Sequence, residues 1–137
     1  MPQFFVEKLL TPNDIGDTNS HQAGIHIPKS LSDFFPALAE SHLNPRATIS
    51  FQSSGDAIGV GVYIHYNNKV VADGTRDEYR ITRVRSLLRD LGAIVGDTLE
   101  LVRLDTTTYA ISVRKARQAP AGALIVNLAH GWRTIRI

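Results

Sequence analysis

The stretch ATISFQSSGDAIGVGVYIHY, residues 47–66, predicts the centre of the fold, because it has the pattern of two β-strands joined by a tight turn. We expect the strands at Ala47–Gln52 and Ile58–Tyr66, with the turn formers Ser-Ser-Gly-Asp between them. In the second strand Gly59 and Gly61 carry no side chain, which indicates that a neighbour approaches closely or that the strand bends. This stretch favours a mostly-β fold.

Further strands are expected on both sides of this hairpin, where β-branched and aromatic residues lie between turn formers. They are Phe4–Leu10, Gly24–Pro28, Lys69–Val71, Thr98–Leu104, Tyr109–Val113 and one more strand within Ala123–Ile137. About seven short strands with one or two short helices predict a mostly-β (α+β) barrel or pseudobarrel. We expect residues 1–117 to form the pseudobarrel, and residues 118–137 to be a linker or a terminal strand that completes the domain.

Two short helices and a hairpin turn complete the expected elements. One helix is expected over residues 30–39, with its first serine as N-cap, and a second over Val84–Leu91 before a glycine. The dipeptide Asn67-Asn68 is typical of a tight hairpin turn. Two segments fit no core element, namely the polar residues 11–22 and the arginine-rich residues 75–83. Long segments of this kind within a small domain are usually functional or disordered.

Composition indicates a single globular domain. It says little about a binding partner, whereas the distribution of charge along the chain says more. The 137 residues carry a formal net charge of only +2, but five arginines lie within 76–89 and five basic residues within 113–137, which has no acid. The absence of cysteine excludes disulfides and thiolate metal sites. The N-terminus has no signal-peptide pattern and the chain no apolar run long enough for a membrane span, so we expect a cytoplasmic protein without membrane contact.

No catalytic motif emerges from the sequence. The five histidines are scattered without zinc-ligand spacing, and no serine lies in a nucleophile elbow. The nearest approach to a metal-dependent nuclease is Asp73 with Glu78-Tyr79-Arg80, in which an arginine takes the place of the usual lysine. We therefore expect no enzyme activity, metal or cofactor in this chain, and we retain a small nuclease at Asp73 and Glu78 as an alternative hypothesis.

The segment Thr75–Arg83 has the chemistry of a DNA-reading strand. In an extended backbone Arg76, Glu78 and Arg80 point to one face, because side chains alternate. Arginine can donate two hydrogen bonds to guanine, and glutamate can accept one from the cytosine amino group. On the residues alone, an exposed strand in which the glutamate is ion-paired with both arginines is the alternative, and charge clusters favour it.

Several short motifs keep a common order across more than half of the chain. They are Lys8-Leu9-Leu10, Asn13-Asp14-Ile15-Gly16, His21-Gln22-Ala23-Gly24-Ile25-His26-Ile27-Pro28, Leu43-Asn44-Pro45, Tyr66-Asn67-Asn68 and Thr75-Arg76-Asp77-Glu78-Tyr79-Arg80-Ile81-Thr82-Arg83. In these motifs the sequence resembles the N-terminal effector DNA-binding domain of the EcoRII restriction endonuclease family. Chance agreement of both the third and the last motif is improbable.

The resemblance implies a DNA-binding pseudobarrel of the kind found in plant B-three transcription-factor domains. Two arms, expected at Asp14–Gln22 and Lys69–Arg83, would flank a concave basic surface and grip double-stranded DNA from the major-groove side. The resemblance assigns base readout to four residues, Arg76, Glu78, Arg80 and His21. Further candidate contacts are Asn19, Ser20, Gln22, His26, Lys29, Lys69, Asp77, Tyr79, Arg83 and Arg85.

These observations favour the effector module of a Type II restriction endonuclease that recognises a short CCWGG-like site. A nuclease domain would then follow at the C-terminal side in the parent protein. Gly74, Tyr79 and His26 depart from the family pattern, which is expected to weaken phosphate contacts or to change the target preference. A free-standing transcription regulator with the same fold is the alternative.

Overall fold

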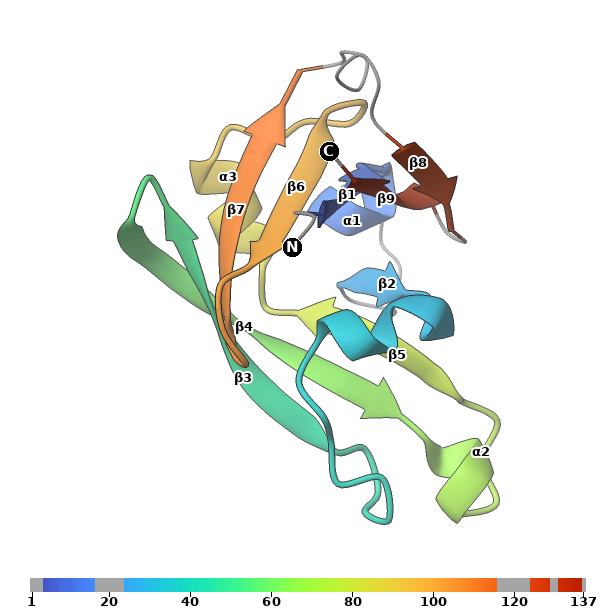
Figure 1. Ribbon diagram of the computed structural model, residues 1–137. Coiled ribbons are helices and arrows are strands. Elements are labelled where there is room, and N and C mark those ends of the chain that lie inside the picture. Colours follow the sequence, from blue (N-terminus) through green and yellow to red (C-terminus); the bar gives the residue numbers. More distant parts are fainter. Residues whose placement is uncertain (1–3, 17–23, 116–123, 129–130, 137) are drawn as a thin grey trace.

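One curled sheet dominates the structure, and nine strands of the described residues form it (Figure 1). The computed structural model describes residues 4–16, 24–115, 124–128 and 131–136. In chain order the elements are β1 (Phe4–Leu9), α1 (Pro12–Ile15), β2 (Ile25–Ile27), the 3-10 helix η1 (Lys29–Phe34), β3 (Arg46–Ser53), β4 (Asp56–Tyr66), α2 (Asn68–Val71), β5 (Glu78–Thr82), α3 (Arg85–Asp90), β6 (Thr98–Arg103), β7 (Thr108–Arg114), β8 (Leu124–Asn127) and β9 (Trp132–Arg136). The mostly-β class is confirmed, with more strands than the sequence indicates.

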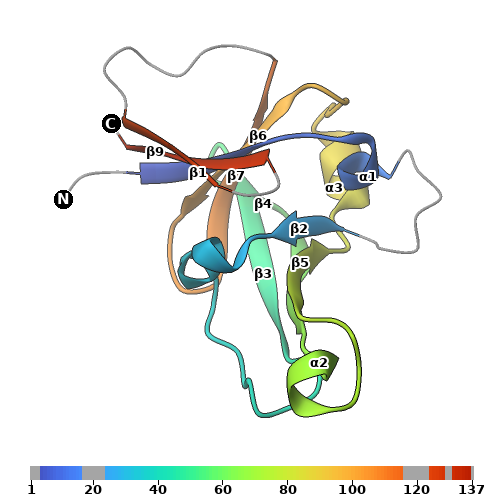
Figure 2. The same ribbon diagram turned by 90° about the vertical axis from the view of Figure 1, so that its right-hand side faces the viewer.

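The sheet has the strand order β2-β5-β4-β3-β7-β6-β1-β9-β8. The parallel pair β3 and β7 joins two antiparallel groups, β2-β5-β4-β3 and β7-β6-β1-β9-β8. Figures 1 and 2 show the sheet curling into a half-barrel rather than lying flat. This is the expected pseudobarrel. Within the described ranges, no helix has the length and apolar character needed to cross a membrane.

The β3–β4 hairpin lies where the sequence predicts it, and its two strand glycines mark close approaches. A Cβ atom at Gly61 would lie 2.8 Å from Cγ1 of Val84. At Gly59 it would lie 3.0 Å from Cδ1 of Leu87. Both neighbours belong to the segment that forms α3 and its N-cap, so the missing side chains allow this segment to pack against the hairpin.

Aromatic side chains fill the core between the sheet and η1. The Phe35 ring stacks on Tyr63 with their centroids 4.8 Å apart. The Tyr109 hydroxyl donates a hydrogen bond of 2.7 Å to the carbonyl of Phe34, so this buried polar atom has its partner. Burial also raises the pKa of Tyr109 to about 12. The hydroxyl therefore stays protonated and available as a donor at neutral pH.

The C-terminal residues form two strands of the same sheet. β8 pairs with β9, and β9 pairs with β1 with Phe5 opposite Ile135. The Trp132 side chain is 1% exposed, and its indole N–H donates a hydrogen bond of 2.7 Å to the carbonyl of His26 in β2. The end of the described chain thereby holds together β1 and β2, which lie far apart in the strand order.

The helix predicted over residues 30–39 is shorter and of another type. η1 covers only Lys29–Phe34, its N-cap is Pro28, and no side chain caps it. Pro36 explains the early end, because a proline disfavours the helical conformation of the residue before it. The prediction of a serine N-cap and of a helix reaching residue 39 was wrong.

The Asn67-Asn68 turn and the strand expected after it are also corrected, because Asn68–Val71 forms α2. Asn67 is buried, and its side chain accepts a hydrogen bond of 2.8 Å from the Asn44 backbone N–H and donates one of 2.8 Å to the His42 carbonyl. The asparagine therefore fastens the end of β4 to the loop before β3, instead of turning a hairpin.

The two segments without a predicted element are partly regular. The polar stretch begins with α1, which Thr11 caps in a capping box with Asp14. The arginine-rich stretch contains β5, which lies between β2 and β4. In Figure 2 α1 and α2 lie toward opposite ends of β5.

Candidate nucleic-acid interface

The strands β3, β4 and β5 carry two faces of opposite character. On one face, Tyr63 and Ile81 are opposite each other and buried in the core. On the other face, Ile64 of β4 lies between Arg46 of β3 and Arg80 of β5. Two residues along β4, Tyr66 is paired with Glu78 of β5. Cross-strand partners share a face, so this second face gathers the polar and basic residues of three strands.

Arg76, Glu78 and Arg80 form one connected cluster on that face, which we call the Arg–Glu–Arg row. The Arg76 Nε donates a hydrogen bond of 2.9 Å to Oε1 of Glu78. The Arg80 Nη2 lies 3.3 Å from the other carboxylate oxygen, and His26 Nε2 lies 3.7 Å from it. The Arg76 guanidinium also stacks 3.8 Å above the Tyr66 ring centroid. The three side chains thus share one face, as predicted. Glu78 is also ion-paired with both arginines, as the alternative interpretation of the sequence expected.

The two arginines of this row differ in their access to solvent. The Arg76 side chain is 36% exposed, whereas that of Arg80 is 5% exposed and hydrogen-bonds the Gly24 carbonyl at 3.4 Å. Burial raises the pKa of Glu78, but the hydrogen bonds from Arg76 and Arg80 outweigh burial and bring the pKa below its usual range. The carboxylate is consequently ionised at neutral pH and able to accept hydrogen bonds.

A histidine held by two carboxylates lies against the core side of the row's strand. His65 Nδ1 is 2.5 Å from Oε2 of Glu40, and its Nε2 is 2.7 Å from Oδ1 of Asp77. Lys29 Nζ lies 2.5 Å from the other oxygen of Asp77. The hydrogen bonds from Lys29 and from His65 lower the pKa of Asp77. These contacts fix the backbone directly between Arg76 and Glu78.

The remaining candidate contacts are not brought together at one place. Tyr79 points to the face opposite Glu78, where its ring stacks on His65 with centroids 4.0 Å apart. Lys69 is exposed on α2, while Arg83 and Arg85 line a cleft near α1. Four candidates lie outside the described residues, namely Asn19, Ser20, His21 and Gln22.

A further arginine of this face, Arg46, was not predicted from the sequence. Arg46 begins β3 and lines the same cleft as Arg83 and Arg85. No motif distinguishes it in the sequence, and only the register of β3 on β4 places it on the face of the Arg–Glu–Arg row. Its exposure and its neighbours make it an additional candidate for contact with an anion.

Three of the basic residues near the C-terminus have structural partners instead. Arg114 and Arg133 both bind the fully buried Glu7 carboxylate of β1. Lys115 Nζ lies 2.8 Å from Asp97 Oδ2. The two arginines thereby tie β1 to β7 and β9, and the charge count of this segment overstates what is available to a partner.

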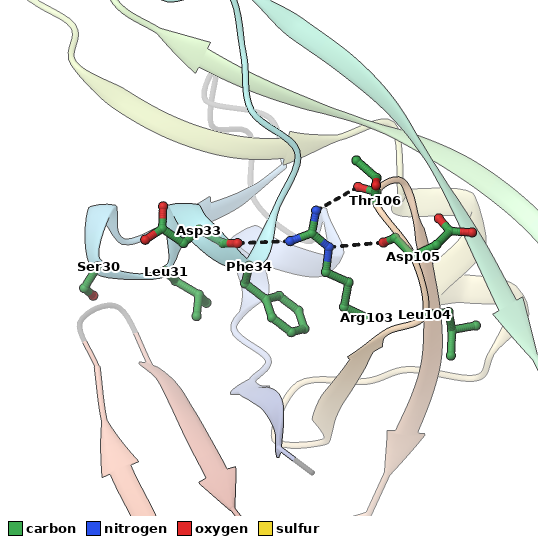
Figure 3. A pocket seen from close by; sticks show the side chains of 8 residues that line it. All are labelled: Ser30, Leu31, Asp33, Phe34, Arg103, Leu104, Asp105 and Thr106. Carbon is green, nitrogen blue, oxygen red and sulfur yellow. Dashed lines mark hydrogen bonds between the residues drawn. The ribbon is translucent and has the colours of Figure 1, made fainter. Parts of the chain in front are cut away.

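A second cavity, of about 610 Å³, lies between η1 and the turn joining β6 to β7 (Figure 3). Arg103 points across it and donates to the backbone carbonyls of Asp33, Asp105 and Thr106 at 3.0 to 3.1 Å. Leu31 and Phe34 also line it. Three carbonyls engage the arginine, and the carboxylates of Asp33 and Asp105 also line the cavity, so this cavity is unsuited to a polyanion.

Carboxylates and histidines do not gather into a metal-binding group of three or more within the described ranges. The Glu78 carboxylate, which the nuclease hypothesis would need as a metal ligand, has both oxygens engaged by arginines. Arginines beside a carboxylate compete with a cation for its oxygens. The surroundings of Glu78 therefore give no support to the nuclease alternative.

The half-barrel fold and a basic open face together are typical of a DNA-binding pseudobarrel. Comparison with protein families makes this specific, because residues 3–95 match the family described as restriction endonuclease EcoRII, N-terminal. The match covers more than half of the chain, and the chain belongs to this family. Membership implies a DNA-binding effector domain of a restriction endonuclease. No curated protein matches the chain significantly.

Proposed function

We propose that this chain binds a short CCWGG-like site in double-stranded DNA as the effector domain of a Type II restriction endonuclease. The observation that carries the proposal is the Arg–Glu–Arg row on an open face of a family member. The major groove admits a two-stranded ribbon, and β5 with its neighbours has the required extended form. Arginine forks and a carboxylate side by side match the donor and acceptor pattern of adjacent G·C pairs.

The three members of the row have different tasks in this proposal. Arg76, whose side chain is partly exposed, offers to guanine a guanidinium already oriented by the Tyr66 ring and by Glu78. Glu78 accepts from the cytosine amino group. Arg80 is buried in the free protein, so its contact with a base requires that the ion pairs rearrange when the duplex arrives.

Two arms would complete the grip on the duplex. The segment Lys69–Arg83 would act as the C-terminal arm, with α2 at its outer end. Asp14–Gln22 would act as the N-terminal arm and contribute His21. Lys29 and Asp77 bind each other beside the row, so their expected effect on DNA is indirect.

Cleavage is assigned to another part of the parent protein. In this proposal the chain needs no metal or cofactor, and a nuclease domain linked at its C-terminal side performs hydrolysis. Binding of the cognate site to this domain would then license or position that cleavage.

The test is a binding titration at physiological salt with three DNAs: a CCWGG duplex, a scrambled duplex and a single strand. A preference of about a thousandfold for the specific duplex is expected of a sequence-reading domain. Equal weak binding to all three would refute sequence reading by this face.

Two arginine variants sharpen the assignment. Arg76→Ala is expected to cost about 1–3 kcal/mol on the specific duplex and little on the scrambled one. Arg89→Ala removes an exposed arginine of α3 outside the row and serves as the matched control. Equal losses on both duplexes for Arg76→Ala would show that Arg76 contacts a phosphate and not a base.

A further inference from the structure

A cleft of about 520 Å³ adjoins the Arg–Glu–Arg row and is lined by residues from α1, β3, β4 and the segment between β5 and α3. Arg46, Arg83 and Arg85 converge on it, and Tyr66 forms part of its wall. Tyr66 is the ring on which Arg76 stacks, so this ring lies between the cleft and the row. A ligand that fills the cleft therefore lies next to whatever Arg76 contacts.

Within the described residues, the arginines that line this cleft form no ion pair. Arg46, Arg83 and Arg85 are exposed, and no carboxylate of the described residues lies within ion-pair distance of any of them. Asp14 also lines the cleft, but its carboxylate is bound by the buried Lys8 ammonium. The cleft is thus lined by three exposed arginines, a composition that favours an anionic ligand.

The backbone at Arg83 is held in an unfavourable conformation. Its φ angle is +64°, in the left-handed region that favours glycine. Arg83 is the residue between β5 and the N-cap of α3, and its side chain lines the cleft from this position. Glycine would remove the strain but also the guanidinium, and strain of this kind is characteristic of functional sites.

We propose that the cleft formed by Arg46, Arg83 and Arg85 binds a backbone phosphate of the duplex, immediately beside the bases that the Arg–Glu–Arg row addresses. The inference rests on the proposed function and deepens it, because it separates the source of affinity from the source of specificity. Phosphate contacts set register and strength without regard to sequence, whereas base contacts discriminate. Arg46 thereby joins the interface as a phosphate contact.

The salt dependence of DNA binding tests this inference. Each phosphate neutralised contributes about −0.9 to the slope of log affinity against log salt. Arg46→Gln, Arg83→Gln and Arg85→Gln are each expected to reduce the slope by up to this amount and to weaken the specific and scrambled duplexes by the same factor. Arg89→Gln, outside the cleft, is expected to leave slope and affinity unchanged.

The outcomes distinguish this inference from the proposed function. If the wild type prefers the CCWGG duplex and the three cleft variants keep its full slope, the phosphate site is refuted and base reading stands. If the wild type shows no preference but the cleft variants lose slope, base reading is refuted and phosphate binding stands. Replacing single phosphates with neutral methylphosphonates locates the contact: the sensitive position should weaken binding by the wild type more than binding by Arg46→Gln.

Two glycine substitutions separate binding from folding. Arg83 and Ser54 both have a positive φ, of +64° and +52°, so both Arg83→Gly and Ser54→Gly are expected to raise the midpoint of urea unfolding. Only Arg83→Gly is expected to weaken DNA binding, because Ser54 lies in the β3–β4 turn and not in the cleft. An Arg83→Gly protein that binds both duplexes as tightly as the wild type would overturn the role of Arg83.

Discussion

Substituting His65 by phenylalanine tests whether the bridge between Glu40 and Asp77 stabilises the strand that carries the Arg–Glu–Arg row. Phenylalanine keeps a flat ring for the stack on Tyr79, which has a centroid distance of 4.0 Å, and removes both ring nitrogens. Both contacts are hydrogen bonds only when the imidazole carries two protons, because a carboxylate can only accept.

The expected loss follows from the exposure of the two carboxylates. Asp77 is 22% exposed and keeps Lys29 as a partner, so losing the bond to His65 costs about 1 kcal/mol. Glu40 is 48% exposed and is readily rehydrated, so its bond is worth about 0.5 kcal/mol. The free energy of unfolding should therefore fall by up to about 1.5 kcal/mol.

Urea unfolding of four proteins measures this value: the wild type, His65→Phe, Asp77→Asn and the double variant. A coupling energy of about 1 kcal/mol is expected between the two substitutions, since they remove the same interaction. His42→Gln, which changes an exposed histidine in the loop before β3, is the control and should cost less than about 0.5 kcal/mol. Additive losses for His65 and Asp77 would refute the bridge as a source of stability.

Three further predictions concern the framework around the interface. Trp132→Phe should lower the free energy of unfolding by about 2 kcal/mol in urea titrations, because a buried indole and its hydrogen bond to β2 are lost. Gly24→Ala should cost about 2 kcal/mol or more, since φ is +90° and a Cβ would lie 2.2 Å from the Ile81 carbonyl oxygen; an unchanged midpoint would contradict this. The hydrogen bond from Lys29 holds the pKa of Asp77 below its value of 3.8 in the unfolded chain, so its contribution is fully present above about pH 5. That contribution is lost as pH falls through the lowered pKa, and the stability difference between wild type and Asp77→Asn should shrink in unfolding titrations at pH 3.

Hairpins were the elements that the sequence predicted best. The β3–β4 and β6–β7 hairpins lie at the expected residues because each is defined by its own turn and by strand-forming residues next to it. β1 and β2 were also found, since proline or polar residues end them. In each case the information that decides the element is local.

Elements decided by distant contacts were missed. Asn67 has the local chemistry of a turn, but its buried side chain binds the loop at residues 42–44, and the chain continues into α2. The residues of β5 alternate as in a strand, but its place between β2 and β4 depends on partners that are far along the chain. Local propensity carries no information about either arrangement.

The site shows the same division. The alternation of side chains placed Arg76, Glu78 and Arg80 on one face from sequence alone, and the structure brings these three together. Alternation also sends Tyr79 to the other face, against His65. Arg46 required the register between two strands, which no short motif contains.

The ion pairs within the Arg–Glu–Arg row bear on how specificity and affinity are divided. In the free protein Glu78 binds both Arg76 and Arg80, so a base that takes the place of one partner exchanges one charge-assisted hydrogen bond for another. The net gain from a correct base is then modest, whereas an incorrect base leaves polar groups of the row without a partner in a desolvated groove. Such a row discriminates well and binds weakly. Under the proposed function, the strength of binding is expected from charges that have no ion-pair partner among the described residues, such as Arg46, Arg83 and Arg85 in the adjoining cleft.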